Sequence, residues 1–221
     1  MEEQIKVSVE GTNRILDCLK RNQVKATFFC TANFALHAPD IIKRIQAEGH
    51  EIASHGFYHW TFKVEDLKTS KDQLEEIIGT KVYGYRQARM MPVSEKAIHD
   101  AGYVYNSSLN PTFIPGRYMR LSTPRTPFIK DSVIQMPASV TPLLRFPLFW
   151  LSCHNLPAVH HYNGEKGAFW QTQRKFFCFP CLLPTTIRRC GLPKIFENGR
   201  KKSSKPFQDL LLICRCDGRR Y

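Results

Sequence analysis

Hydrophobic and polar positions along the first 110 residues alternate between helix-like and strand-like periods. Apolar residues at 9, 15, 16 and 19 recur at helical spacing and are followed by the polar run 20–22. The β-branched and aromatic run 25–30 is typical of a buried parallel strand. Further helices are predicted at 39–48, 65–78 and 94–102, and further strands at 51–54, 82–86 and 103–105. This alternation predicts βα units around a parallel sheet or barrel, and therefore an α/β fold.

Beyond residue 110 the periodicity weakens. Seven prolines fall between positions 111 and 147, with one further strand predicted at 133–136. After Pro157 regular periodicity nearly vanishes, and only the segment 206–214 resembles an element. We therefore predict an α/β domain at 1–157 and an irregular, poorly ordered tail at 158–221.

The composition is that of a soluble globular protein, with 43% hydrophobic and 23% charged residues. No uncharged apolar run reaches the length needed to cross a bilayer, so no membrane partner is expected. The first residues carry neither a basic region nor an apolar region typical of a signal peptide. A cytoplasmic protein is the expectation, whereas the oligomeric state stays open.

The net charge of +13 is concentrated in the tail, where 158–221 holds 13 basic and 4 acidic residues. Five of the eight cysteines lie there too, but their spacing does not fit the paired knuckles of a zinc ribbon. An evenly basic surface would indicate nucleic-acid binding; a basic tail leaves nucleic acid as a remote hypothesis. A translation that runs out of frame from about residue 157 would also give this abrupt change of character, and we keep that hypothesis open.

The sharpest local feature is a pair of histidines, His55 and His59, directly after the predicted strand 51–54. Two imidazoles four residues apart can face the same way on a helical turn and bind one divalent metal ion. Active sites also collect at the carboxyl ends of parallel strands. The alternative is a pair of ordinary histidines near a surface turn, because a zinc site needs a third ligand.

Two segments in order, KATFF at 25–29 and GHEIASHGFYH at 49–59, resemble the polysaccharide deacetylase (NodB-homology) family. GYR at 84–86 and YNSS at 105–108 extend the resemblance over residues 9–140. The resemblance implies a distorted (β/α) barrel of the glycoside hydrolase/deacetylase type, here only partial. It also implies a hydrolase of non-peptide carbon–nitrogen bonds, which removes N-acetyl (or O-acetyl) groups from a polysaccharide or other glycan.

The resemblance also implies roles for individual residues. His55 and His59 correspond to two ligands of a divalent metal ion, usually Zn²⁺, whose third ligand in the family is an aspartate. Arg86 corresponds to the arginine that orients the catalytic carboxylate. Tyr85 and Pro137 fall on stretches that imply contact with the glycan substrate.

The chain departs from the family pattern at both ends. Both family aspartates lie in a first-strand motif that has no counterpart before Val9, and no convincing histidine acid follows Pro157. The general base and the general acid are therefore not found, and truncation at both ends is predicted. The alternative function is an inactive remnant that retains only weak metal or glycan binding.

Three further expectations follow from these departures. The acidic residues Glu2, Glu3, Glu10 and Asp17 are interpreted as a solvated face rather than as a substitute base. Ala88 stands where the family has proline, so Arg86 either keeps its role or is a plain surface arginine; we favour the first. A barrel without its first strand would leave neighbouring strand edges open, which predicts poor solubility.

Overall fold

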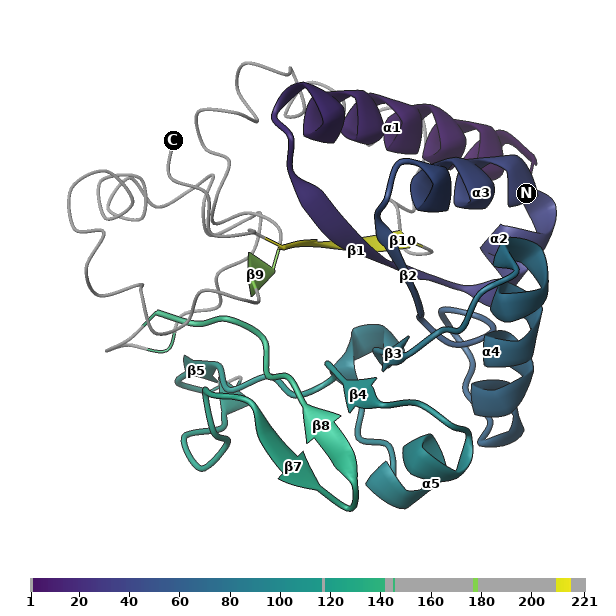
Figure 1. Ribbon diagram of the computed structural model, residues 1–221. Helices are drawn as coiled ribbons and strands as arrows, with labels where there is room; N and C mark the ends of the chain where they lie inside the picture. The colour runs from purple at the N-terminus through teal and green to yellow at the C-terminus, as the bar shows by residue number, and fades with distance from the viewer. Residues whose placement is uncertain (1, 117, 142–144, 146–176, 179–209, 216–221) are drawn as a thin grey trace.

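The computed structural model describes residues 2–116, 118–141, 145, 177–178 and 210–215 (Figure 1). The helices are α1 Glu2–Arg21, α2 Ala32–His37, α3 Pro39–Ala47, α4 Glu65–Ile78 and α5 Glu95–Asp100, with a short 3₁₀ turn at Ala88–Met90. The strands are β1 Lys25–Cys30, β2 Glu51–Ser54, β3 Gly84–Tyr85, β4 Tyr105–Asn106, β5 Phe113–Ile114, β6 Tyr118–Met119, β7 Phe128–Lys130, β8 Val133–Gln135, β9 Phe177–Cys178 and β10 Leu210–Arg215.

Eight of these strands form one sheet in the order β7-β8-β4-β3-β2-β1-β10-β9. The five strands β1, β2, β3, β4 and β8 run parallel and lie side by side in chain order (Figure 1). This is the predicted α/β fold class, in the strand order expected for part of a (β/α) barrel. Over the described residues the sheet is open and ends at β7 and β9.

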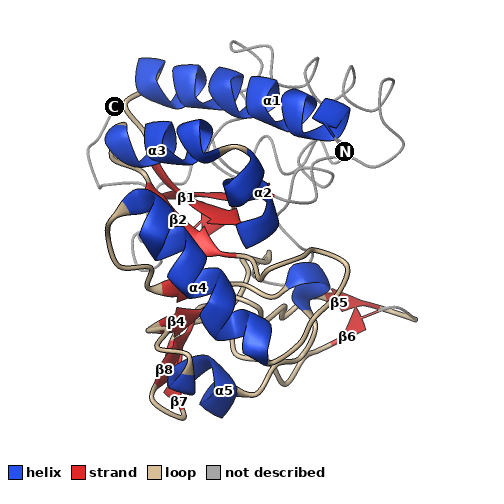
Figure 2. Cartoon of the chain, turned by 90° about the vertical axis from the view of Figure 1, so that its right-hand side faces the viewer, coloured by secondary structure: helices blue, strands red, loops and turns tan. Residues whose placement is uncertain are grey.

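The helices gather on one face of the sheet (Figure 2). The apolar stripe of each helix packs against strand side chains, and the core side chains Leu16, Phe28, Ile42, Leu74 and Ile98 are fully buried. Burying an aliphatic or aromatic side chain of this size stabilises a fold by about 1.5–3 kcal/mol. The core therefore lies between the helices and the parallel strands, and it fixes the strand ends that carry the candidate site.

Element boundaries follow local capping chemistry. Ser94, the residue before α5, caps the helix by accepting a hydrogen bond from the backbone N–H of Ala97 at 3.5 Å. Gly79 closes α4 in the left-handed conformation at φ +68°, where glycine carries no steric cost. Acidic Glu3, Glu10 and Asp17 are exposed on α1, so the predicted solvated face is confirmed for these three.

The expectation of an open edge beside the strand 25–30 is wrong. β10 pairs antiparallel with β1 along its whole length, from Lys25↔Arg215 to Cys30↔Leu210. The sequence of β10, LLLICR, is rich in residues that suit a strand, and its backbone satisfies the hydrogen-bonding groups of β1. Poor solubility stays a prediction. The proposed boundary at 157 and most of the tail lie outside the described residues.

None of the helices in the described part of the chain combines the length and apolar character needed to cross a membrane.

Candidate functional site

The predicted site residues lie at one edge of the parallel sheet. His55 directly follows β2, Tyr85 ends β3 and Arg86 follows it, and Pro137 comes two residues after β8. Because β2, β3, β4 and β8 are parallel neighbours, their carboxyl ends meet at the same edge. The structure therefore brings together strand ends that are up to 82 positions apart in the sequence.

The segment that carries the two histidines is an irregular loop, and the predicted helical turn is wrong. Gly56 adopts φ +83°, a left-handed conformation that interrupts any helix between His55 and His59. The two rings nevertheless lie close together, with centroids 5.4 Å apart and planes tilted by 52°. The turn at Gly56 therefore places the two imidazole rings side by side, as the predicted helical turn would have done.

Backbone hydrogen bonds from neighbouring elements hold this loop. The N–H of His55 donates to the carbonyl of Cys30 at the end of β1, over 2.8 Å. The first amides of α2, those of Ala32 and Asn33, donate to the carbonyls of Gly56 and Phe57 at 3.0 and 3.1 Å. The start of α2 therefore fixes the loop, although this six-residue helix was not predicted from the sequence.

The tautomer of His55 follows from its hydrogen bond to the backbone of Arg86. His55 Nδ1 lies 2.6 Å from the carbonyl oxygen of Arg86. A carbonyl can only accept, so Nδ1 carries the proton and Nε2 keeps a free lone pair. Burial, together with the nearby charges of His59 and Arg86, outweighs the hydrogen bond to the Arg86 carbonyl and lowers the pKa of His55 to about 3. His55 is therefore neutral at physiological pH, the state in which an imidazole binds a metal.

The burial of His55 contradicts one of the two interpretations of the histidine pair, that of ordinary histidines near a surface turn, for this member. His55 is only 5% exposed, so it is not an ordinary surface histidine. His59 is half-buried beside it. Neutral imidazole nitrogens are good ligands for zinc, so the pair fits two positions of a tetrahedral site. No group of three or more potential ligands occurs among the described residues, so these supply part of a site and not a complete one.

Arg86 is 4% exposed, so the interpretation as a plain surface arginine is wrong. Its guanidinium lies over the Phe29 ring, 6.0 Å from the centroid, and one nitrogen contacts the sulfur of Met90 at 3.9 Å. Among the described residues, its buried Nη1 has no hydrogen-bond partner, and no carboxylate pairs with it. A buried cation of this kind favours a nearby anion.

The other two candidates differ in accessibility. Tyr85 is fully buried and donates its hydroxyl hydrogen to Gln87, and its ring packs against that of Tyr103 with centroids 5.1 Å apart and planes tilted by 40°. Pro137 is half-buried and directly follows Met136, whose carbonyl accepts from the Ser107 hydroxyl at 3.0 Å. Substrate contact stays a prediction for both residues, and the burial of Tyr85 requires a rearrangement for any direct contact.

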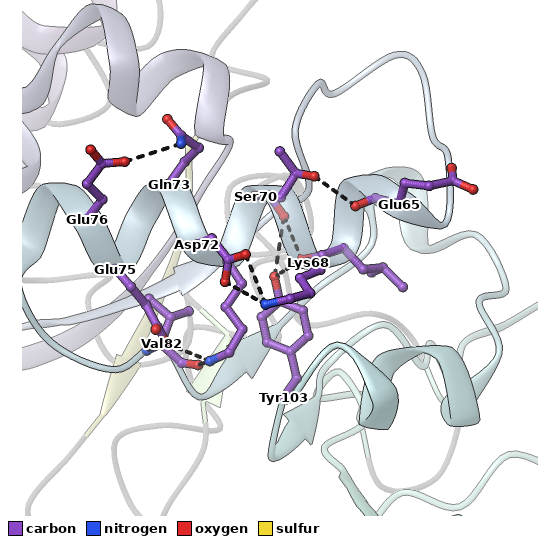
Figure 3. A network of polar contacts seen from close by, with 12 residues as sticks. Glu65, Lys68, Ser70, Asp72, Gln73, Glu75, Glu76, Val82 and Tyr103 are labelled. Carbon is purple, nitrogen blue, oxygen red and sulfur yellow. Dashed lines mark hydrogen bonds and ion pairs between the residues drawn. The ribbon is translucent and has the colours of Figure 1, made fainter.

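Three buried hydroxyl groups next to the histidine loop were not predicted from the sequence as part of the site. The hydroxyl oxygens of Ser54 and Ser70 lie 3.1 Å apart. The Ser70 hydroxyl also lies 3.3 Å from the Tyr103 hydroxyl (Figure 3). These residues come from β2, from α4 and from the segment before β4, so only the fold brings them together. The one available signal was the serine directly before His55.

Comparison with known proteins gives the same result as the motifs. The sequence model of the polysaccharide deacetylase family matches residues 6–90, which include the histidine loop and Arg86. A peptidoglycan-N-acetylglucosamine deacetylase of Bacillus cereus is 49% identical over 87 residues, which are 38% of this chain and 31% of the relative. A peptidoglycan-N-acetylmuramic acid deacetylase of Bacillus subtilis is 36% identical over 66 residues, 30% of this chain and 25% of the relative.

A solved structure from Mycobacterium smegmatis, assigned as a polysaccharide deacetylase, is 25% identical with a TM-score of 0.49 and covers 60% of this chain and 47% of its own. The present chain spans about a third or less of the length of the two Bacillus deacetylases. The matched residues 6–90 include the segments KATFF and GHEIASHGFYH as well as His55 and Arg86. Residues 6–90 of this chain are therefore similar in sequence to the polysaccharide deacetylase family, whose matched members are named as deacetylases.

Proposed function

We propose that this chain carries the histidine half of a metal-dependent carbohydrate deacetylase that hydrolyses N-acetyl groups on a glycan. The observation that supports it most strongly is the hydrogen bond from His55 Nδ1 to the Arg86 carbonyl at 2.6 Å. This bond fixes the tautomer in which Nε2 has a free lone pair, and metal-binding histidines commonly donate their other ring N–H to a carbonyl in this way.

Each residue has a distinct task in this proposal. His55 and His59 hold a divalent metal ion, with zinc as the first choice for imidazole ligands. When bound, such an ion polarises the acetamide carbonyl and lowers the pKa of a water molecule. Arg86 orients a carboxylate by its buried guanidinium, and Pro137 lines the substrate groove next to the strand ends.

The substrate class follows from the relatives. Two matched proteins are named as deacetylases of peptidoglycan N-acetylglucosamine and N-acetylmuramic acid. We therefore propose an N-acetylated hexosamine polymer as the substrate, with acetate and a free amine as products. The cytoplasmic location and the O-acetyl alternative stay predictions.

A second candidate is a binding protein without turnover. Among the described residues no third ligand joins the histidine pair, and no carboxylate pairs with Arg86. A general base typically contributes about 10²–10⁴-fold to rate, so a chain without one would bind metal or glycan but hydrolyse very slowly.

Zinc affinity and acetate release from an N-acetylglucosamine oligomer, measured on the full chain, test both candidates. We expect zinc binding that is lost in His55→Ala and in His59→Ala. The matched control is His99→Ala, because the His99 side chain is 54% exposed on α5, away from the site. Chelation should abolish acetate release if the chain is an enzyme.

Zinc binding with acetate release supports the deacetylase, whereas zinc binding without release supports the binding protein. Equal zinc affinity in wild type and His55→Ala would overturn the metal site in both.

A further inference from the structure

Three buried hydroxyl groups connect helix α4 to the loop that carries the two histidines. Ser54 is the last residue of β2, Ser70 lies in the middle of α4, and Tyr103 precedes β4. All three residues are at most 2% exposed. The network ends at the backbone N–H of Gly56, which donates to Ser54 Oγ at 3.1 Å.

One arrangement of the hydroxyl hydrogens gives this network a single direction. The Tyr103 hydroxyl donates to the carbonyl of Leu67 at 2.8 Å, which leaves its oxygen free to accept. Ser54 Oγ accepts from Gly56, so its own hydrogen is available for Ser70 Oγ, 3.1 Å away. Ser70 then donates to the Tyr103 oxygen at 3.3 Å or to the Leu67 carbonyl at 3.1 Å (Figure 3). When Ser70 donates to Tyr103, each of the three hydroxyls both donates and accepts a hydrogen bond, as is usual for buried polar groups.

Gly56 is the residue at which this chain of hydroxyls acts on the site. Its φ of +83° turns the backbone between His55 and His59, and its conformation determines how the second imidazole lies relative to the first. The carbonyl of Gly56 is held by Ala32 at 3.0 Å, so the Ser54 hydroxyl fixes the other side of the same residue. Both polar groups of the turn residue are thus bonded.

We propose that the hydroxyls of Ser54, Ser70 and Tyr103 form a directed hydrogen-bond chain that positions His55 and His59 for a metal through the amide of Gly56. This inference rests on the proposed function and adds positioning residues to it. The network reaches the histidine loop through the Gly56 N–H, so the three residues act on the loop backbone. Outer-shell partners of this kind typically contribute about 10–100-fold to metal affinity.

Hydroxyl deletions in the full chain test the proposal with two readouts. The first is hydrogen exchange of the Gly56 amide without metal, measured relative to amides of α1. The second is zinc affinity by competition with a chelating dye. Ser54→Ala and Ser70→Ala should lower the relative protection of Gly56 by about 10-fold or more and weaken zinc binding by about 10–100-fold. Tyr103→Phe should act in the same direction, and Ser70→Thr, which keeps the hydroxyl, should restore both.

A matched control separates positioning from general stability. Thr12 is buried in α1, and its hydroxyl donates to the Ser8 carbonyl at 2.7 Å, so Thr12→Val also deletes a buried helical hydroxyl. Its zinc affinity and relative Gly56 protection should stay at the wild-type values. Unchanged protection in Ser54→Ala and Ser70→Ala, or an equal loss in Thr12→Val, overturns the positioning chain. A wild-type chain that binds no zinc, but loses Gly56 protection in both serine variants, overturns the metal site of the proposed function alone.

Discussion

His55 Nδ1 lies 2.6 Å from the carbonyl oxygen of Arg86, so one hydrogen bond joins the two strand ends that carry the candidate chemistry. The Arg86 N–H donates in turn to the carbonyl of Ser54 at 2.9 Å, which makes the link between β2 and β3 reciprocal. A shift of the Arg86 backbone would therefore move the His55 ring through its Nδ1–H. The backbone of Arg86 fixes the tautomer, whereas its side chain is available for another role.

The buried guanidinium of Arg86 gives the first prediction. Over the described part of the chain it has no carboxylate partner, and desolvation of an unpaired charge is costly. Arg86→Met keeps the contact with Phe29 and removes that cost. We expect its free energy of unfolding, measured by urea denaturation, to lie within about 1 kcal/mol of the wild type or above it.

Lys71→Met is the matched comparison, because Lys71 is buried to a similar degree but pairs with Glu75 at 2.6 Å and with the carbonyl of Val82. It should lose about 3 kcal/mol or more, since it leaves a partly buried carboxylate without its main partner. A loss of the same size in Arg86→Met would show that Arg86 has an anionic partner outside the described residues.

Helices and strands whose hydrophobic pattern continues over several residues could be predicted from the sequence. The helix predicted at 65–78 and the strand predicted at 25–30 have these boundaries in the structure, because each buries a continuous apolar stripe and ends at a glycine or polar turn. The histidine pair was predictable for a similar reason, since both members lie within one short motif. Local sequence therefore sufficed wherever the determining residues are near one another.

The remainder depends on contacts between distant residues. The strands β3 and β4 have two residues each and take their positions from register, as in Gly84↔Tyr105. The pairing of β10 with β1 joins segments about 185 residues apart, which no local pattern indicates. The role of His50 also depends on a distant residue. Its Nδ1 accepts a hydrogen bond from the Ala26 N–H at 3.2 Å, a structural role that the motif alone does not reveal.

The second prediction concerns acid stability and Glu75. Burial raises the pKa of Glu75, but hydrogen bonds from Lys71, from the Val82 N–H and from Lys81 outweigh it and lower the pKa to about 2 (Figure 3). Because the folded pKa lies below the usual 4.5, the stabilisation is present above pH 4.5 and is lost as the pH falls towards 2. The loss over this window should be at most about 3 kcal/mol, at 1.36 kcal/mol for each pKa unit.

Glu75→Gln checks this assignment. The variant should be less stable than the wild type at pH 7, and the difference should shrink as the pH is lowered from 4.5 to 2 in urea-unfolding series. Glu76→Gln, a neighbouring exposed carboxylate on the same helix, should follow the wild-type curve. Parallel curves for wild type and Glu75→Gln across this range would contradict the proposed ion-pair network.

The last prediction concerns the close approach of β3 and β4 beneath the strand ends. A Cβ added to Gly84 would overlap the ring of Tyr105, the paired residue on β4. Tyr105 cannot move away freely, because its hydroxyl donates to Glu51 at 2.9 Å and its ring packs edge-on against Phe29. Gly84→Ala should therefore cost about 1–3 kcal/mol of unfolding free energy, as overpacking in a core typically does.

A double-mutant cycle distinguishes this overlap from a backbone effect. In a Tyr105→Ala background the added methyl group has space, so Gly84→Ala should cost less than about 1 kcal/mol. Gly79→Ala serves as the comparison, since Gly79 has φ +68° and nothing within 4 Å of an added Cβ. Its cost, about 1 kcal/mol from the left-handed backbone, should be the same in both backgrounds. An equal cost of Gly84→Ala with and without the Tyr105 ring would show that the register of β3 and β4 differs from Gly84↔Tyr105.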